Sequence, residues 1–164
     1  MADFYGTSGN NTINRIGSNT NVRLFGLNGN DTLIGGNGSD WLQGASGGSG
    51  TTAHIDQDVL LGGGGTDYYV LGTGNTSFYM SSGYATLREF DIRYDWVVLA
   101  DGINYLSSRI QLQAINISGG SAADTLISLD GNGSSRLCVI IFAYRIMKCL
   151  LGKTFRTILR IFYQ

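Results

Sequence analysis

The stretch Gly35-Gly36-Asn37-Gly38-Ser39-Asp40-Trp41-Leu42-Gln43 decides the fold, because its pattern of Gly, Asp and Leu recurs along the chain with a period of nine residues. The unit reads Gly-x-x-Gly-x-Asp-x-Leu-x. In the one gap of the series, Ser49 and Thr51 stand where an Asp and a Leu would complete it. The residues on the four shared phases are Gly26, Gly35, Gly44 and Gly62, then Gly29, Gly38, Gly47 and Gly65, then Asp31, Asp40, Asp58 and Asp67, and finally Leu24, Leu33, Leu42 and Leu60.

Each unit predicts a tight turn followed by a very short strand. The six Gly-rich residues form the turn, and the three residues x-Leu-x form a strand whose Leu faces one way while its neighbours face the other. A single unit buries almost nothing, whereas stacked units bury a continuous ladder of Leu side chains. A disordered linker lacks such an apolar ladder. The pattern therefore predicts an all-β chain built on a short parallel solenoid.

The stacked turns predict a cation site. Each turn presents one carboxylate together with several backbone carbonyls, and stacked carboxylates repel each other unless a cation lies between them. Mixed carboxylate and carbonyl oxygens in a flexible loop suit Ca²⁺, whereas Mg²⁺ requires stricter geometry and retains its waters. We therefore expect calcium as the ligand.

This unit resembles the RTX, or hemolysin-type, calcium-binding nonapeptide Gly-Gly-x-Gly-x-Asp-x-U-x over Leu24–Val70. The resemblance implies a β-roll of the secreted bacterial kind, in which two nonapeptides make one coil and successive loops alternate sides. It implies that Asp31, Ser49 and Asp67 line one side of the roll and that Asp40 and Asp58 line the other. The calcium ligands that it implies are Gly26, Asn28, Asp31, Gly35, Asn37, Asp40, Asp58, Gly62, Gly64 and Asp67.

Two departures from the repeat limit the expected number of ions. Ser49 lacks a carboxylate, and the unit that ends at Asp58 has lost both of its Gly residues, so residues 44–58 also read as a looser loop that keeps the register. We expect about one to three bound ions of modest affinity. A weaker copy of the unit starts at Gly6 and places Asn11 in the Asp position, where an amide oxygen is a weaker ligand.

The chain is expected to have four parts: a degenerate repeat (1–23), the calcium-binding β-roll (24–71), a strand-rich cap (72–135) and a basic, apolar tail (136–164). Strands are predicted at Tyr94–Leu99, Ile110–Ala114 and Asp124–Leu129, with Leu137–Ile141 as a closing strand. Such a cap would cover the open edge of the roll. The acids Glu89, Asp91 and Asp95 are interpreted as solvated side chains rather than as a further cation site.

Three interpretations of the tail stay open. It can be a basic amphipathic helix that docks on the body of the protein or on an anionic membrane, a diverged export signal, or out-of-frame sequence after a truncation. Contact with a membrane is the least favoured function. All 12 acidic residues precede Arg136 together with five of the 11 basic residues, and an acidic body disfavours nucleic acid as a partner.

The sequence gives little support for catalysis. Ser46 lies in a formal G-x-S-x-G motif, but inside the repeat and not between a strand and a helix. His54 is the single His, which leaves a zinc site short of its usual ligands. Cys138 and Cys149 do not make a disulfide framework. We therefore expect a chain that is not an enzyme.

The favoured function is a secreted, calcium-binding structural module whose roll folds when it binds Ca²⁺. The N-terminus shows no Sec-type signal peptide, so the resemblance implies export by a type I route. The alternative is that the chain is the non-catalytic C-terminal fragment of a larger secreted RTX-type enzyme, toxin or adhesin.

Overall fold

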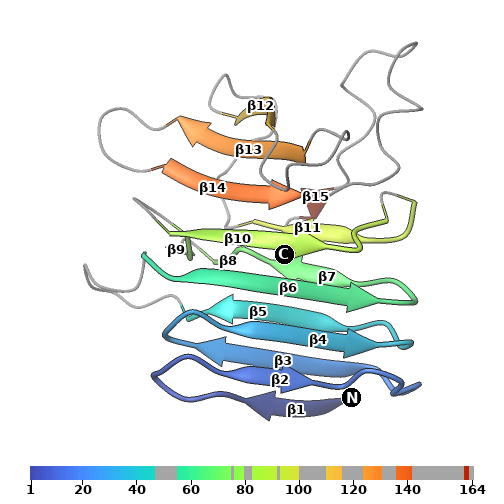
Figure 1. Ribbon diagram of the computed structural model, residues 1–164. Coiled ribbons are helices and arrows are strands. Elements are labelled where there is room, and N and C mark those ends of the chain that lie inside the picture. The colour runs from blue at the N-terminus through green and yellow to red at the C-terminus, as the bar shows by residue number, and fades with distance from the viewer. Residues whose placement is uncertain are drawn as a thin grey trace.

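The chain winds into a parallel β-roll, in a computed structural model that describes residues 1–46, 55–74, 76–79, 83–91 and 93–99 and the backbone of strands in 110–115, 124–130, 136–141 and 161–162. Successive strands of the roll join two sheets in turn, so that two strands and two turns complete one coil. The coils stack from β1 at one end toward β10 and β11 (Figure 1).

The first sheet has six strands, and every neighbouring pair in it is parallel. From β1 to β11, each step from one strand to the next in this sheet advances the chain by one coil. In spatial order the strands are β1 (Ala2–Tyr5), β3 (Val22–Leu27), β5 (Trp41–Ala45), β7 (Tyr68–Val70), β11 (Trp96–Val98) and β15 (Ile161–Phe162).

The second sheet has seven strands and changes direction at its C-terminal end. From the N-terminal edge its parallel part consists of β2 (Thr12–Asn14), β4 (Thr32–Gly36), β6 (Gln57–Gly63), β10 (Tyr84–Arg88) and β14 (Arg136–Ile141). Two antiparallel strands follow, β13 (Asp124–Asp130) and β12 (Ile110–Ile115). A short hairpin of β8 (Gly72–Thr73) and β9 (Thr76–Ser77) connects the roll to β10.

These strands confirm the strand-rich segment after the repeats. β11, β12, β13 and β14 form within or across the four predicted stretches, and β14 extends the second sheet beyond β10. The helical interpretation of the tail is not confirmed. In the part of the chain that the structure describes, no helix is long and apolar enough to cross a membrane.

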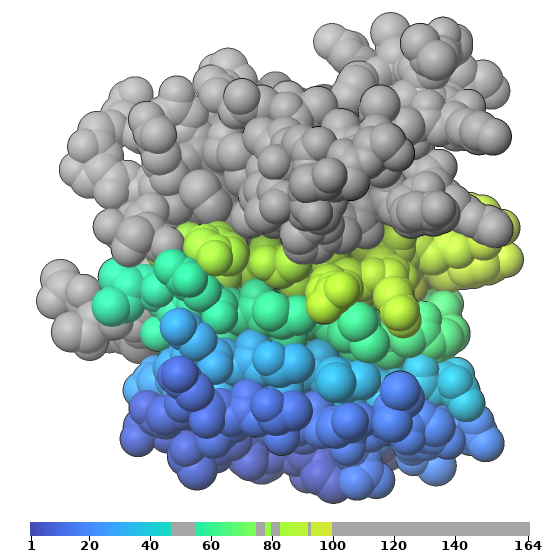
Figure 2. Space-filling view, viewed as in Figure 1, coloured from blue at the N-terminus to red at the C-terminus, as the bar shows by residue number. Residues whose placement is uncertain are grey.

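Two facing ladders of apolar side chains form the core. In the first sheet the register places Leu24 beside Leu42 and Leu42 beside Tyr69. In the second sheet it places Leu33 beside Leu60 and Leu60 beside Leu87. All of these side chains are fully buried, which confirms the predicted leucine ladder. The space-filling view shows the resulting continuous stack, from the blue N-terminal coils to the yellow-green residues before 100 (Figure 2).

Candidate metal centre

The four repeated aspartates lie inside the roll. Each stands two residues before an inward-facing core residue, and side chains two apart in a strand face the same way. The exposed fractions confirm this placement, at 1% for Asp31 and 0% for Asp40, Asp58 and Asp67. Buried carboxylates require partners, since an ion removed from water without compensation is costly. The partners of each oxygen therefore decide what these residues can bind.

One carboxylate oxygen of each aspartate binds the backbone of the preceding coil. Asp31 Oδ1 accepts from the N–H of Asn11 at 2.7 Å, and Asp58 Oδ1 accepts from the N–H of Asp31 at 2.7 Å. We call Asn11, Asp31 and Asp58 the Asp31 column. In this column Asn11 lies beside Gly6, in the position that the weaker copy of the unit assigns to the Asp.

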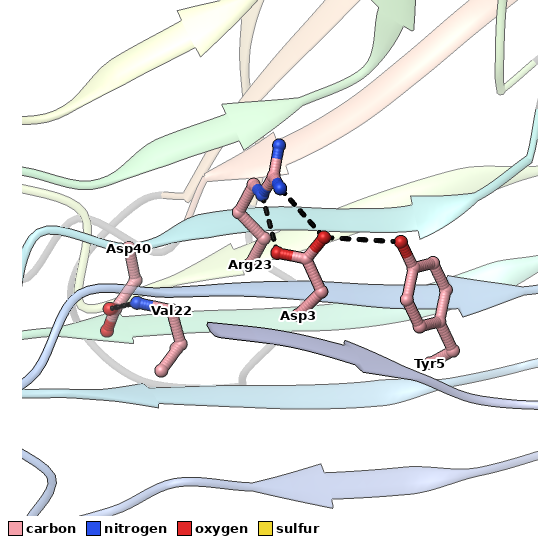
Figure 3. Close-up of polar contacts among 5 residues, drawn as sticks. All are labelled: Asp3, Tyr5, Val22, Arg23 and Asp40. Carbon is pink, nitrogen blue, oxygen red and sulfur yellow. Dashed lines mark hydrogen bonds and ion pairs between the residues drawn. The ribbon is translucent and has the colours of Figure 1, made fainter. Parts of the chain in front are cut away.

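A second column lies on the other side of the roll. Asp40 Oδ1 accepts from the N–H of Val22 at 2.9 Å (Figure 3), and Asp67 Oδ1 accepts from the N–H of Asp40 at 2.9 Å. Asp95 continues the series, because its Oδ1 accepts from the N–H of Asp67 at 3.0 Å. We call Asp40, Asp67 and Asp95 the Asp40 column.

The predicted division of the aspartates between the two sides is therefore wrong. Asp31 shares a column with Asp58 and not with Asp67, and Asp40 shares one with Asp67 and not with Asp58. The 18 residues between Asp40 and Asp58 equal two repeat units in length, but they make one passage from β5 to β6. Asp58 and Asp67 therefore each lie on the side of the roll opposite to the predicted one. Ser49 lies outside the described residues.

A second set of hydrogen bonds runs in the opposite direction. The residues before Asp31 and Asp40 accept from the backbone of the next coil: Asn30 Oδ1 from the N–H of Gln57 at 2.9 Å, and Ser39 Oγ from the N–H of Thr66 at 3.1 Å. Adjacent turns are thus joined reciprocally. The repeat pattern did not predict this role, although a small polar residue before the Asp is visible in both units.

The first Gly of each unit makes room for the carboxylate. A Cβ at Gly26 would collide with Asp31 Oδ2 and with the carbonyl oxygen of Gly44, which belongs to the next coil. The space beside Gly35 is bordered in the same way by Asp40 Oδ2 and the carbonyl oxygen of Gly62. A carboxylate oxygen and a carbonyl oxygen thus converge on one small space in each case. Both are acceptors, so a proton or a cation between them is favourable.

The second oxygens of the aspartates differ in their partners. Asp40 Oδ2 accepts from the N–H of Gly36 at 2.8 Å, and Asp58 Oδ2 accepts from the hydroxyl of Tyr79 at 2.6 Å. Asp31 Oδ2 and Asp67 Oδ2 are buried and have no hydrogen-bond partner among the described residues. These two oxygens are the ones that a cation could satisfy.

The backbone four residues earlier accounts for this difference. Gly36, four residues before Asp40, is not among the residues with positive φ and turns its N–H toward the carboxylate. The equivalent residues before Asp31 and Asp67 are Leu27 and Gly63, with φ of 81° and 99°. That left-handed conformation coincides with the absence of an N–H bond to the carboxylate.

Burial raises the pKa of three of these carboxyls. Desolvation raises the pKa of Asp31 and of Asp58 to about 6 and that of Asp67 to about 7, against the opposing effect of their hydrogen bonds. Neighbouring acids raise each pKa further, as Asp56 does for Asp31. The ionised carboxylates therefore destabilise the metal-free roll near neutral pH, and a cation would reverse the effect.

The other predicted ligands occupy two kinds of position. Gly26, Gly35 and Gly62 lie buried beside the carboxylates, whereas Asn28, Asn37 and Gly64 are exposed at the turns. Asn28 Oδ1 accepts from the Ser46 hydroxyl, and Asn37 Nδ2 donates to Asn19. Within the described ranges, no three side chains of His, Cys, Asp or Glu gather as a metal cluster. A cation here would depend on one carboxylate per turn supplemented by backbone carbonyls.

Two acids outside the columns form surface ion pairs. Asp3 binds Arg23 at 2.7 Å on the outer face of the first sheet (Figure 3), and Asp91 binds Arg93 at 2.6 Å. Asp95 belongs to the Asp40 column, so its interpretation as a solvated side chain is wrong. Its Oδ2 accepts from the N–H of Asp91 at 2.8 Å, which fills the position that Gly36 fills for Asp40.

Comparison with known proteins identifies the repeat. The family model described as RTX calcium-binding nonapeptide repeat, in four copies, matches residues 16–49 and 56–77. No curated protein matches the chain.

Two solved structures share the fold. An extracellular lipase, LipA from Serratia marcescens, is 20% identical with a TM-score of 0.55, over 88% of this chain and 19% of the lipase. The AlgE6R3 subunit of the Azotobacter vinelandii mannuronan C5-epimerase is 18% identical with a TM-score of 0.55, over 83% of this chain and 72% of that one. This chain thus corresponds to about a fifth of the length of the lipase.

Proposed function

Because this chain belongs, through its repeats, to the RTX calcium-binding nonapeptide-repeat family, we propose that its two aspartate columns bind calcium ions and that ion binding stabilises the roll. One observation carries the proposal: Asp31 Oδ2 and Asp67 Oδ2 are buried without a hydrogen-bond partner among the described residues. An ionised oxygen in that state is unfavourable, and a hard divalent cation that prefers oxygen ligands removes the penalty.

The proposed ligands combine carboxylates with main-chain oxygens. Asp31 and Asp67 would supply the carboxylates, and Asp40 remains a predicted ligand although its second oxygen accepts from the N–H of Gly36. Gly26, Gly35 and Gly62, with the exposed Asn28, Asn37 and Gly64, would contribute backbone carbonyls, because the Asn side chains already bind neighbouring turns. Asp58 remains a predicted ligand, but its second oxygen is occupied by Tyr79. A bound calcium ion would supply positive charge between the coils, and no catalysis is proposed.

Calcium would act as a folding ligand. In the metal-free chain the raised pKa values of Asp31 and Asp67 indicate that neutral pH weakens the roll. An ion that binds the folded chain and not the unfolded one stabilises the fold by mass action, by about 2.7 kcal/mol at one hundred times its dissociation constant. Export from a cytosol poor in calcium to a medium rich in it would then complete folding outside the cell, which is consistent with secretion by a type I route.

Titration of calcium-depleted protein with CaCl₂ tests the proposal. Far-UV circular dichroism should show a gain of β-structure, and calorimetry should give a whole number of ions. Asp67→Asn should lower that number by one, because an amide oxygen is a poorer ligand than a carboxylate. Asp3→Asn is the matched control, since Asp3 forms only surface contacts with Arg23 and Tyr5 among the described residues. An unchanged spectrum from EGTA to about 10 mM calcium would contradict the proposal.

A second candidate is that the roll is the non-catalytic part of a larger secreted protein. The coverage of 19% of the lipase supports it, since there the similar segment is a minor part of an enzyme. The division of this chain into four parts belongs to the same proposal. An antibody against the roll, applied to culture medium and to cell extract, separates the candidates. A free module gives a band near 17.6 kDa in the medium, and a larger protein gives a heavier band.

A further inference from the structure

Two buried tyrosine hydroxyls end the columns of converging oxygens. Beside Gly6 the oxygens are Asn11 Oδ1 and the carbonyl of Gly26, and beside Gly26 they are Asp31 Oδ2 and the carbonyl of Gly44. Beside Gly44 the carboxylate oxygen is that of Asp58, but the other oxygen is the hydroxyl of Tyr79. A side-chain hydroxyl thus stands where each earlier coil receives a Gly carbonyl.

In the Asp40 column a tyrosine hydroxyl also replaces the Gly carbonyl, beside Asp67, but it donates its proton elsewhere. Beside Gly35 lie Asp40 Oδ2 and the carbonyl of Gly62, whereas beside Gly62 lie Asp67 Oδ2 and the hydroxyl of Tyr69. The Tyr69 hydroxyl donates its proton to the carbonyl of Arg88 at 3.0 Å and accepts from the N–H of Gly62 at 2.9 Å. It has no second proton for Asp67, whose Oδ2 stays unpartnered among the described residues.

Tyr79 behaves differently because it gives its proton to the carboxylate. The bond from its hydroxyl to Asp58 Oδ2 is 2.6 Å, and both side chains are fully buried. With Oδ1 bound to the N–H of Asp31, both oxygens of Asp58 are satisfied without a cation. An ion at this position would have to displace a buried hydroxyl that is already a good hydrogen-bond donor.

We propose that the Tyr79 hydroxyl occupies the cation position beside Asp58 and thereby closes the C-terminal end of the Asp31 column to calcium, whereas Tyr69 leaves the cation position beside Asp67 open. This inference rests on the proposed function and determines which of the repeated aspartates act in it. Asp58 is then a structural acceptor, and the Asp31 column holds its ion at Asp31. The phenolic proton of Tyr79 thus removes one of the ion positions that the repeated aspartates predict.

Replacing Tyr79 by Phe tests the inference, because it removes the hydroxyl and keeps the ring in the core. Calorimetry should show that the variant binds one calcium ion more per chain than the natural protein. Adding Asp58→Asn to the variant should abolish the binding of that ion. In the absence of calcium the variant should melt at a lower temperature, since Asp58 loses its donor. Tyr84→Phe is the control, because it removes an exposed hydroxyl that binds the Gln57 side chain at 3.1 Å. That control should leave the ion count unchanged.

A single substitution at Asp58 keeps the test valid where the Tyr79 variant does not fold. Asp58→Asn retains an oxygen for the Tyr79 hydroxyl, so the ion count should equal that of the natural protein. Asp31→Asn and Asp67→Asn should each lower the count by one. A loss of one ion in Asp58→Asn, or an unchanged count in Tyr79→Phe, would overturn the role of Tyr79 and leave calcium binding intact. Absence of calcium binding in every variant and in the natural protein would refute the proposed function itself.

Discussion

The backbone N–H of Asp31 donates a 2.7 Å hydrogen bond to the carboxylate of Asp58, a residue 27 positions later in the chain. The same bond in the other column joins Val22 to Asp40 across 18 positions. One coil therefore closes with either length. The nine additional residues lie between β5 and β6, in the segment from Ser46 to Asp56.

Deleting residues 47–55 should leave the roll and its calcium binding intact. The deletion joins Ser46 to Asp56. Six residues then remain from Gly44 to Asp58, which is the length from the first Gly to the Asp in the other units. Asp56→Gly should accompany it, because Gly29 and Gly65 occupy the same position of the unit with φ near 100°. A shorter loop changes the closure entropy by less than about 1 kcal/mol.

The control for that deletion removes residues 46–56 and leaves only Ala45 and Gln57 between Gly44 and Asp58. Such a turn is too short to reach the second sheet, so the calcium-dependent circular dichroism signal should be lost. If the nine-residue deletion also abolished the signal, the assignment of nine additional residues to the connection between β5 and β6 would be incorrect.

Alanine at Gly26 should be far more disruptive than alanine at Gly9. A Cβ at Gly26 meets Asp31 Oδ2 and the Gly44 carbonyl, whereas a Cβ at Gly9 meets nothing within 4 Å. Overpacking of this kind costs about 1–3 kcal/mol. Chemical denaturation in excess calcium measures the difference, and calorimetry should show one ion fewer for Gly26→Ala. Equal stability of the two variants would contradict the close approach of Asp31 to the backbone.

The metal-free roll should be more stable at pH 4.5 than at pH 7.5. The pKa values of Asp31, Asp58 and Asp67 rise on folding from 3.8 to about 6, 6 and 7, so the folded chain binds more protons than the unfolded chain between these limits. The stability of the fold therefore falls as the pH rises through this window. For one carboxyl the loss is at most about 1.4 kcal/mol per pH unit, and screening by solvent reduces it further.

Thermal unfolding in calcium-stripped buffer measures this dependence. Saturating calcium should reverse it, because the ion binds the ionised carboxylates and competes with protons. Asp67→Asn should reduce the dependence in metal-free buffer, as its neutral amide does not titrate. A metal-free roll that is equally stable at both pH values would show that these carboxyls do not titrate as their burial implies.

Leu27→Gly should cost less stability than Leu61→Gly by about 1 kcal/mol or more. Both side chains are half-buried, but Leu27 has a φ of 81°, a conformation that disfavours L side chains by about 1–2 kcal/mol. Glycine removes that strain at position 27 and removes none at position 61, which is not among the residues with positive φ. Urea unfolding of both variants compares the two costs, and an equal loss would argue against strain at Leu27.

The sequence predicted the coil, the buried leucines and the stacked carboxylates, because each depends only on the nine-residue period. It could not predict the sides on which Asp58 and Asp67 lie. A degenerate repeat and an inserted loop of equal length preserve the same period, and only the strand pairing separates them. The role of the Tyr79 hydroxyl could not be predicted either, since Tyr79 contacts Asp58 from outside any repeat.

The polar residues before Asp31 and Asp40 are visible in the sequence, but their binding partners are not. Asn30 and Ser39 occupy equivalent positions, yet a polar side chain in a turn has an ordinary explanation in its exposure to water. Their bonds to Gln57 and Thr66 appear only once the coils are stacked. Periodicity thus identifies which residues align, and the three-dimensional arrangement determines which neighbour each of them binds.

The reciprocal bonds between adjacent turns have an evolutionary consequence. A carboxylate of one coil binds a main-chain N–H of the preceding coil, and Asn30 and Ser39 bind main-chain N–H groups of the following coil, so one coil is a template for another. Duplication or loss of an 18-residue segment of the gene would change the length of the array without disturbing its remaining members. Ion capacity could thus vary among descendants by whole steps.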